Sequence, residues 1–95
     1  MASMFIKHRV ADYAKWKPVF DEHETARRAA GLTAHSLHRG TDDPNVIIIA
    51  FRAADLNKAK GFASSDELKS AMARAGVQGP PEIWFADEVE EKRYS

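Results

Sequence analysis

The first hydrophobic pattern in the chain is an alternation over residues 4–10. Alternation with a period of two is typical of a strand that buries one face and exposes the other. The side chains predicted to share the buried face are Met4, Ile6, His8 and Val10. We therefore predict a first strand here, in which His8 is a titratable group among apolar neighbours.

After this strand the apolar positions recur every three or four residues, which is the period of a helix with one buried side. Asp12 is suited to cap the first turn, and Gly31 to end the helix in a left-handed conformation. We predict a helix over residues 12–30 that bends or restarts near Pro18, because proline lacks the amide hydrogen that a helix uses. A sheet must cover its apolar stripe, which consists of Tyr13, Trp16, Val19, Phe20, His23, Ala26 and Ala30.

A β-hairpin is predicted next. Residues 32–41 carry few large aliphatic side chains among polar ones, as in an edge strand. Residues 42–45 have turn chemistry, with Pro44 suited to the second turn position. Residues 46–51 are apolar without alternation, which favours a central strand buried on both faces.

The second half of the chain predicts a broken helix and a last strand. Asp55 caps a segment over residues 56–62, and residues 64–67 form a capping box that opens another helix. The last strand is predicted over residues 82–89, after a stiff approach through two prolines. In that strand two sets of side chains alternate, and either set can face the helices: Ile83, Phe85 and Val89, or Trp84 and Ala86.

The predicted order is strand, helix, strand, strand, broken helix, strand, with the third strand beside the first. This is an α+β fold, a ferredoxin-like βαββαβ antiparallel sheet with the helices on one face, in one domain over residues 4–90. Residues 1–3 are interpreted either as native sequence or as an expression scar, and residues 91–95 as a fraying tail. Because the other face would expose the central strand and Phe5, we expect a homodimer in which a second copy covers it, sheet against sheet.

The composition argues against several classes of partner. The 14 basic and 14 acidic side chains cancel, so no electrostatic footprint for nucleic acid or an anionic membrane is visible. No apolar run approaches the roughly 18 residues of a membrane span, and residues 1–10 lack the apolar core of a signal peptide. The absence of cysteine removes thiol catalysis and cysteine metal sites and agrees with a reducing compartment, so we expect a cytoplasmic protein.

No catalytic motif identifies a reaction. No glycine-rich loop follows a strand and no nucleophile lies in an elbow motif, so nucleotide binding and triad hydrolysis have no support. His35 and His38 suggest a metal site, but residues three apart on a strand point to opposite faces. We therefore expect no metal.

Several spaced residues nevertheless resemble a known family. They are Val10-x-Asp12-Tyr13-x-x-Trp16-x-x-x-Phe20-Asp21, Arg28-x-x-Gly31, Phe62-x-x-Ser65-x-x-Leu68-x-x-Ala71-Met72-x-x-Ala75-Gly76-Val77 and Pro80-Pro81-Glu82. The pattern spans nearly the whole chain and resembles the dimeric α+β barrel superfamily, in particular its small bacterial antibiotic biosynthesis monooxygenase-like and cyclase-labelled domains. The resemblance implies that fold and a ligand site between sheet and helices in each subunit. It leaves the reaction open, because the superfamily includes cofactor-free monooxygenases, haem-degrading enzymes, polyketide cyclases, isomerases and effector-binding domains.

The resemblance suggests a homodimeric enzyme that acts on a hydrophobic, aromatic or polyketide-like small molecule by proton transfer. The asparagine, tryptophan and histidine pattern of the haem-degrading group is not matched here, so we expect no haem and no other cofactor. The alternatives are a ligand-binding or carrier module of the same fold without catalysis and, third, a purely structural subunit.

The candidate proton acceptors are His8 and His23, because histidine is the side chain with a near-neutral pKa. Tyr13 or Arg52 would hold an oxyanion. The candidate substrate-binding side chains are large residues expected between the helices and the sheet: Trp16, Phe20, Phe51, Phe62, Met72 and Trp84, with Phe85 as the alternative to Trp84. The competing interpretation is that each of them is an ordinary core residue.

Overall fold

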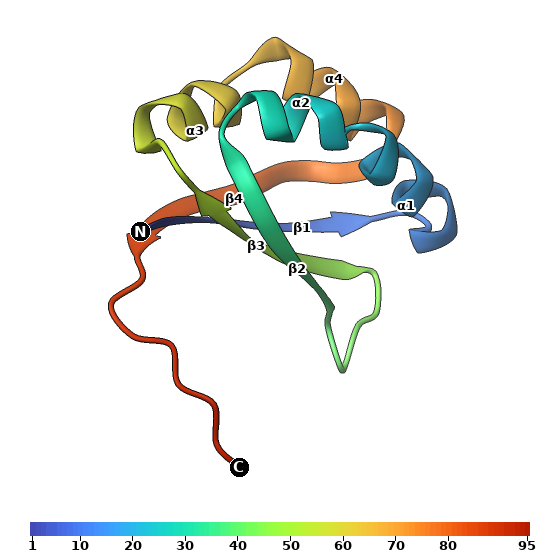
Figure 1. Cartoon of the computed structure of the whole chain (residues 1–95). Coiled ribbons are helices and arrows are strands. Elements are labelled where there is room, and N and C mark those ends of the chain that lie inside the picture. Colours follow the sequence, from blue (N-terminus) through green and yellow to red (C-terminus); the bar gives the residue numbers. More distant parts are fainter.

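Four strands form one antiparallel sheet in the order β2-β3-β1-β4. They are β1 (Ala2–Val10), β2 (Leu32–Arg39), β3 (Val46–Ala53) and β4 (Val77–Asp87). The computed structural model, which describes residues 1–95, has four helices, and all of them cover the same face of the sheet (Figure 1). The helices are α1 (Tyr13–Glu22), α2 (Glu24–Ala29), α3 (Leu56–Ala63) and α4 (Asp66–Arg74). The predicted ferredoxin-like α+β fold, with β3 beside β1, is therefore confirmed.

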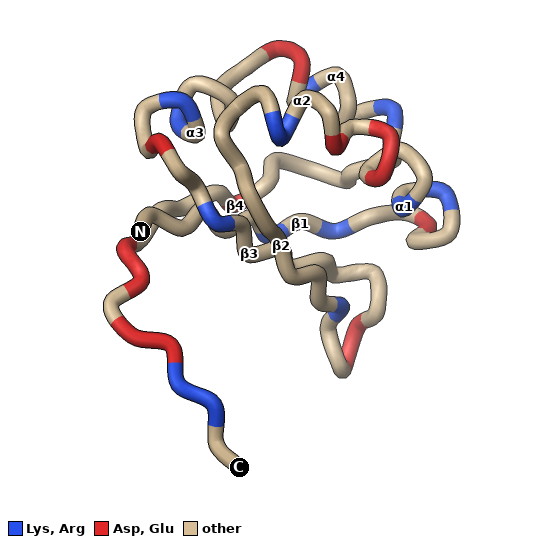
Figure 2. The backbone as a smooth tube through the Cα atoms, viewed as in Figure 1, with Lys and Arg blue, Asp and Glu red and all other residues tan.

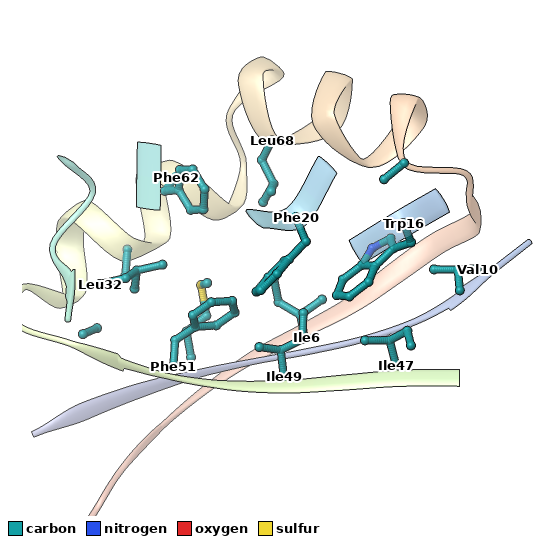
Figure 3. Close-up of a cluster of buried hydrophobic side chains, with 14 residues drawn as sticks. Ile6, Val10, Trp16, Phe20, Leu32, Ile47, Ile49, Phe51, Phe62 and Leu68 are labelled. Carbon is teal, nitrogen blue, oxygen red and sulfur yellow. The ribbon is translucent and has the colours of Figure 1, made fainter. Parts of the chain in front are cut away.

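The hydrophobic core lies between this sheet and the helices (Figure 3). The sheet contributes the alternate side chains of β1 and β3 that face the helices, namely Met4, Ile6, Val10, Ile47, Ile49, Phe51 and Ala53. The helices contribute large side chains from above, among them Trp16, Phe20, Phe62 and Leu68. The alternation predicted for β1 is thus confirmed. None of the helices is long and apolar enough to cross a membrane.

Strand β3 differs from the prediction that both of its faces are buried. Ile47 and Ile49 are 0% and 1% exposed, whereas Val46, Ile48 and Ala50 on the other side are only half-buried. The reason is that the helices cover one face of the sheet and a single chain leaves the second face open (Figure 1). In an apolar run without alternation, the residue types do not reveal which set is covered.

The predicted long helix is two helices, and the break is at His23 rather than at Pro18. Pro18 lies on the exposed side of α1, as does Ala14, so water can bond the Ala14 carbonyl in place of the missing amide. At the break, the carbonyl of Phe20 accepts hydrogen bonds from the amide of His23 (3.2 Å) and from Nη1 of Arg27 (2.6 Å). The buried Arg27 therefore stabilises a break that no local pattern marks.

The helix caps predicted at Asp12 and Asp55 are confirmed. Their carboxylates accept backbone amides in the first turns of α1 and α3, at 2.9 and 3.1 Å. In α4 the cap is Ser65, one residue later than the predicted capping box, and its Oγ accepts the amide of Leu68 at 3.1 Å. Ser64 instead donates its hydroxyl to carbonyls at the end of α3. Ser65 also donates its hydroxyl to the Phe62 carbonyl at 2.7 Å, so it links the end of α3 to the start of α4.

Strand β4 begins at Val77, earlier than the predicted start at residue 82, and includes both prolines. It tolerates them because it is an edge strand, and an amide on its outer side needs no partner in the sheet. Its pairing with β1 shifts beside His8, opposite which residues 79–81 form a bulge. Gly79, with φ of +73°, supplies a conformation that favours glycine in this bulge.

Residues 88–95 follow β4 without helix or strand and run away from the sheet (Figure 1). Val89 does not continue the last strand as predicted, because β4 ends at Asp87. Arg52 on β3 forms ion pairs with the carboxylates of Glu88 and Glu91 in this segment.

Candidate functional site

His8 is the most unusual side chain of the core. It lies on β1, is 7% exposed, and neither ring nitrogen has a hydrogen-bond partner. Its ring meets the edge of Trp16, with centroids 5.7 Å apart. Burial lowers the pKa of His8 to about 4, because the charged form loses its hydration. His8 is therefore a neutral imidazole at pH 7, with its polar atoms directed into an apolar environment.

A small internal cavity of about 40 Å³ lies between the sheet and the helices beside His8. This volume suits about one or two water molecules, far below the several hundred Å³ of a pocket for a drug-sized ligand. The lining comes from β1, β3 and all four helices or their ends: Ile6, His8, Trp16, Val19, Phe20, His23, Arg27, Ile49, Phe51, Phe62, Leu68, Ala71, Met72 and Ala75. The side chains of this lining that can make polar contacts with an occupant are its two histidines, its arginine and the indole N–H of Trp16.

Aromatic rings form a continuous layer above this cavity. Trp16 and Phe20 are one turn apart on α1 and stack with their centroids 4.8 Å apart, as their parallel rings in Figure 3 indicate. The Phe20 ring then meets the edge of His35 on β2, at 5.1 Å. Such a layer presents flat apolar surfaces, which suit an aromatic ligand as well as a dry core.

His23 occupies the junction between α1 and α2. Its ring stacks on Phe62, and its Nε2 is buried 3.4 Å from Oε1 of Glu67 on α4 without a hydrogen bond of good geometry. Glu67 is free to make this approach because Ser65, rather than Ser64, caps α4.

The structure brings together most of the residues predicted for the site. Of the candidate acceptors, both His8 and His23 line the cavity. The predicted substrate-binding residues that line it with them are Trp16, Phe20, Phe51, Phe62 and Met72. The predicted face of β1 places His8 in the lining, and the predicted stripe of α1 places Trp16 and Phe20 in it.

Three candidates lie elsewhere. Tyr13 contacts Trp16, with ring centroids 5.8 Å apart, but does not line the cavity. Trp84 is on the open face of the sheet, 43% exposed and stacked on Phe5 at 5.4 Å, because β4 turns Ile83 and Phe85 toward the helices instead. Arg52 is also on the open face, where it pairs with the carboxylates of the C-terminal segment.

Arg27 is the charged lining residue, and sequence reasoning did not include it. By its position alone it is a favourable charge near the end of a helix. A second signal is present, because Trp16, Phe20, His23 and Arg27 follow one another at intervals of four, three and four residues. Arg27 thus occupies a place on the buried stripe where an apolar residue is expected.

Histidine pairs in this chain do not converge on a metal. His35 faces Phe20 on the helix side, whereas His38 faces the open side and contacts the hydroxyl of Ser36 at 3.2 Å. The prediction that these two residues point to opposite faces is confirmed. No group of three or more His, Cys, Asp or Glu side chains is arranged to hold a metal ion.

Of the comparisons with known proteins, the one with solved structures found similar proteins. No family model matches the chain, and no curated protein sequence matches it. Among solved structures, a protein from Bordetella bronchiseptica assigned to the antibiotic biosynthesis monooxygenases is similar with a TM-score of 0.78 and 14% identity, over 94% of this chain and 97% of that one. A protein from Caulobacter crescentus with the same assignment has a TM-score of 0.72 and 23% identity, over 94% and 90%.

SnoaB, a cofactor-independent oxygenase from Streptomyces nogalater, is similar with a TM-score of 0.69 and 14% identity, over 96% of this chain and 97% of that one. The resemblance inferred from the sequence is therefore confirmed at the level of the fold. At such identities the likeness establishes the fold, and the activity has to be argued from the residues.

Proposed function

We propose that this chain forms a cytoplasmic homodimeric enzyme, cofactor-free and monooxygenase- or cyclase-like, that acts on a hydrophobic aromatic or polyketide-like molecule by proton transfer. The observation that carries this proposal is His8, a buried imidazole whose two nitrogens lack partners and which lines an apolar cavity. Buried polar atoms are nearly always hydrogen-bonded, so such an imidazole is suited to a ligand. The fold shared with a cofactor-independent oxygenase supports the reaction class.

The proposed chemistry begins with the neutral His8. A ring nitrogen accepts a proton from an acidic phenol or activated carbon of the substrate, and the electron pair of the broken bond stays on the substrate. The pKa of His8 is about 4 because burial penalises the charge of an imidazolium and no neighbouring side chain compensates it. An anion formed beside His8 supplies that compensation and raises its pKa. If the reaction is oxidative, dioxygen is the oxidant that attacks the resulting carbanion.

The small size of the cavity requires a rearrangement before an aromatic substrate can bind. Phe20 and Met72 are the side chains best able to move, because Phe20 stands at the helix break and Met72 is flexible and only half-buried. Trp16 is 3% exposed and would stay as the wall against which the substrate ring stacks.

The homodimer is proposed from the open face of the sheet. Phe5 and Trp84 stack there beside the half-buried Ile48 and Ala50 of the central strand. An apolar group of this kind in the middle of a sheet is typical of a protein contact. A second copy of the chain would bury it without any change in the helix layer.

The test is to follow His8 by NMR of its ring nitrogens while hydroxylated naphthalenes and anthrones are added, and to measure oxygen uptake in the same samples. We expect binding to raise the pKa of His8 and turnover to cease in His8→Leu. The matched control is His38→Leu, an exposed histidine that should leave both readouts unchanged. Turnover in a folded His8→Leu protein would contradict the proposed role.

The second candidate is a carrier module that binds the same ligands without reaction. It is favoured by the absence of any carboxylate among the lining residues, since a carboxylate beside His8 would strengthen it as a base. A carrier module would bind the ligand without changing the pKa of His8 and without consuming the ligand. The enzyme would change both.

A further inference from the structure

Arg27 carries a buried charge that no ion pair accounts for. The side chain belongs to α2 and is 5% exposed, and its guanidinium lies 3.8 Å above the ring of Phe20. Its Nη1 donates to the Phe20 carbonyl, and none of the seven ion pairs in the structure includes Arg27. A guanidinium has five donor hydrogens, so most of them remain for another partner.

Arg27 holds a partly desolvated charge at the edge of the core, where its remaining donors still reach the solvent of a groove. Burial lowers the pKa of Arg27, and the nearby charges of Glu24 and Asp21 offset this only in part. A buried charge without a direct counter-ion generally destabilises a fold, and a hydrophobic residue at the same place is often no worse for stability. A specific role toward a ligand is therefore a better explanation for Arg27 than structural support alone.

The position of Arg27 indicates what that role is. Arg27 and Phe51 line the internal cavity, and the same two residues line an open groove of about 700 Å³ at the edge of the sheet. The rest of this groove, here called the β2 groove, is formed by Glu24, Arg28, Leu32, Thr33, Ala34 and His35. Arg27 and Phe51 thus lie between the open groove and the apolar cavity that His8 lines.

The charge around the β2 groove favours an anion at this point. Glu24 is its only acidic residue, and it is drawn toward Arg28 at 3.8 Å. Figure 2 shows the basic segment of α2 beside the end of β2. The pKa of the nearby His35 is lowered, first by burial and then by the charge of Arg27. His35 is therefore neutral, so Arg27 is the cation that binds the anion and His35 can add one hydrogen bond.

We propose that the β2 groove is the entrance to the cavity and that Arg27 binds an anionic oxygen group, a carboxylate or an enolate, on an aromatic ligand. The ring of the ligand would replace Phe20 as the partner of the guanidinium plane and stack on Trp16, while the anionic group remains at the groove. The hydrogen bond from Nη1 to the Phe20 carbonyl can remain, because the other donors of the guanidinium are available to the anionic group. The inference deepens the proposed function, because it names the substrate class of the site that contains His8.

The experiment uses two probes of nearly equal shape, 2-naphthoate and its uncharged analogue 2-naphthamide, with affinities measured by calorimetry. The whole chain should bind naphthoate about tenfold or more tightly than naphthamide, which is the usual worth of a hydrogen bond to a charged partner. In Arg27→Met the preference should disappear through weaker naphthoate binding alone. The matched control is Arg74→Met, which removes the same charge from an exposed position of α4 outside the groove and should keep the preference.

A second measurement needs no substitution and remains decisive if Arg27→Met does not fold. The Nε–H signal of Arg27 in the unaltered chain should shift further with saturating naphthoate than with saturating naphthamide, because both rings stack on the guanidinium and only naphthoate brings a charged acceptor. Equal affinity for the two probes, a preference that survives in folded Arg27→Met, or an Arg27 signal that shifts no further with naphthoate than with naphthamide would each overturn the inference. The proposed function fails separately, because naphthoate can bind at Arg27 in a protein whose His8 never takes a proton from any substrate.

Discussion

The imidazole of His8 lies edge-on to the indole of Trp16, with ring centroids 5.7 Å apart and planes inclined by 65°. One ring comes from the first strand and the other from the first helix, so the contact is where the sheet and the helix layer meet. Trp16 in turn stacks on Phe20, which keeps water from this side of the histidine. The same packing therefore closes the core and sets the protonation state of the group to which we assign the chemistry.

The first prediction concerns the pH dependence of stability. The pKa of His8 is about 4 in the folded chain and about 6.5 when unfolded, so between these values the unfolded state binds the proton and the folded state does not. The contribution of His8 is complete above pH 6.5 and is lost as the pH falls toward 4, by about 3 kcal/mol in all. Urea denaturation at several pH values measures it.

The control variants for this prediction are His8→Phe and His38→Phe. His8→Phe keeps an aromatic ring against Trp16 but has nothing to titrate, so its stability should fall less steeply between pH 6.5 and 4. His38→Phe, at an exposed position, should retain the slope of the unaltered chain. Parallel profiles for His8→Phe and the unaltered chain would contradict the burial of a neutral His8.

The second prediction concerns the core contribution of Trp16. The side chain is 3% exposed, so Trp16→Ala should lower the free energy of unfolding by roughly 3–5 kcal/mol through lost contacts and a new cavity. Tyr94→Ala removes an aromatic ring that is 93% exposed and should change stability very little. Chemical denaturation of the two variants tests this, and a loss well below 2 kcal/mol for Trp16→Ala would indicate a pocket wall that already collapses easily.

The third prediction concerns the homodimer. From the sequence, Ile47→Asp or Ile49→Asp is the natural choice to break it, but both side chains face the helices and their substitution would disrupt the core. The residue of β3 on the open face is Ile48, and Ile48→Asp should give a folded monomer in sedimentation. Val89→Asp also replaces a β-branched apolar residue by a carboxylate, at a 94% exposed site, and should leave the dimer intact. A monomeric unaltered chain would remove the basis of this proposal.

Local patterns in the sequence were sufficient to predict most of the fold. The face of β1 that carries His8 follows from alternation, and the caps at Asp12 and Asp55 follow from residues that accept amides at a helix start. These features depend on neighbours within a few residues. The same holds for Trp16 and Phe20 in the cavity lining, which belong to the buried stripe of α1.

The features that sequence reasoning missed depend on distant parts of the chain. The break at His23 relies on Arg27 reaching back to the Phe20 carbonyl, and the early start of β4 relies on its place at the edge of the sheet. The side on which Trp84 lies follows from the pairing of β4 with β1, which a strand with apolar residues on both faces does not reveal. Pairing and tertiary hydrogen bonds decided each of these cases.

The last prediction compares two glycines in the helix layer. Gly31 follows α2 with φ of +82°, so Gly31→Ala should lower the free energy of unfolding by about 1 kcal/mol, because an L-residue with a Cβ is strained there. Gly61 lies inside α3, where an added methyl group would meet nothing within 4 Å, so Gly61→Ala should raise stability by up to about 1 kcal/mol through higher helix propensity. Thermal unfolding should therefore shift in opposite directions for the same chemical change. Shifts of the same sign would mean that Gly31 does not form the left-handed end that starts β2 and positions its edge beside Arg27.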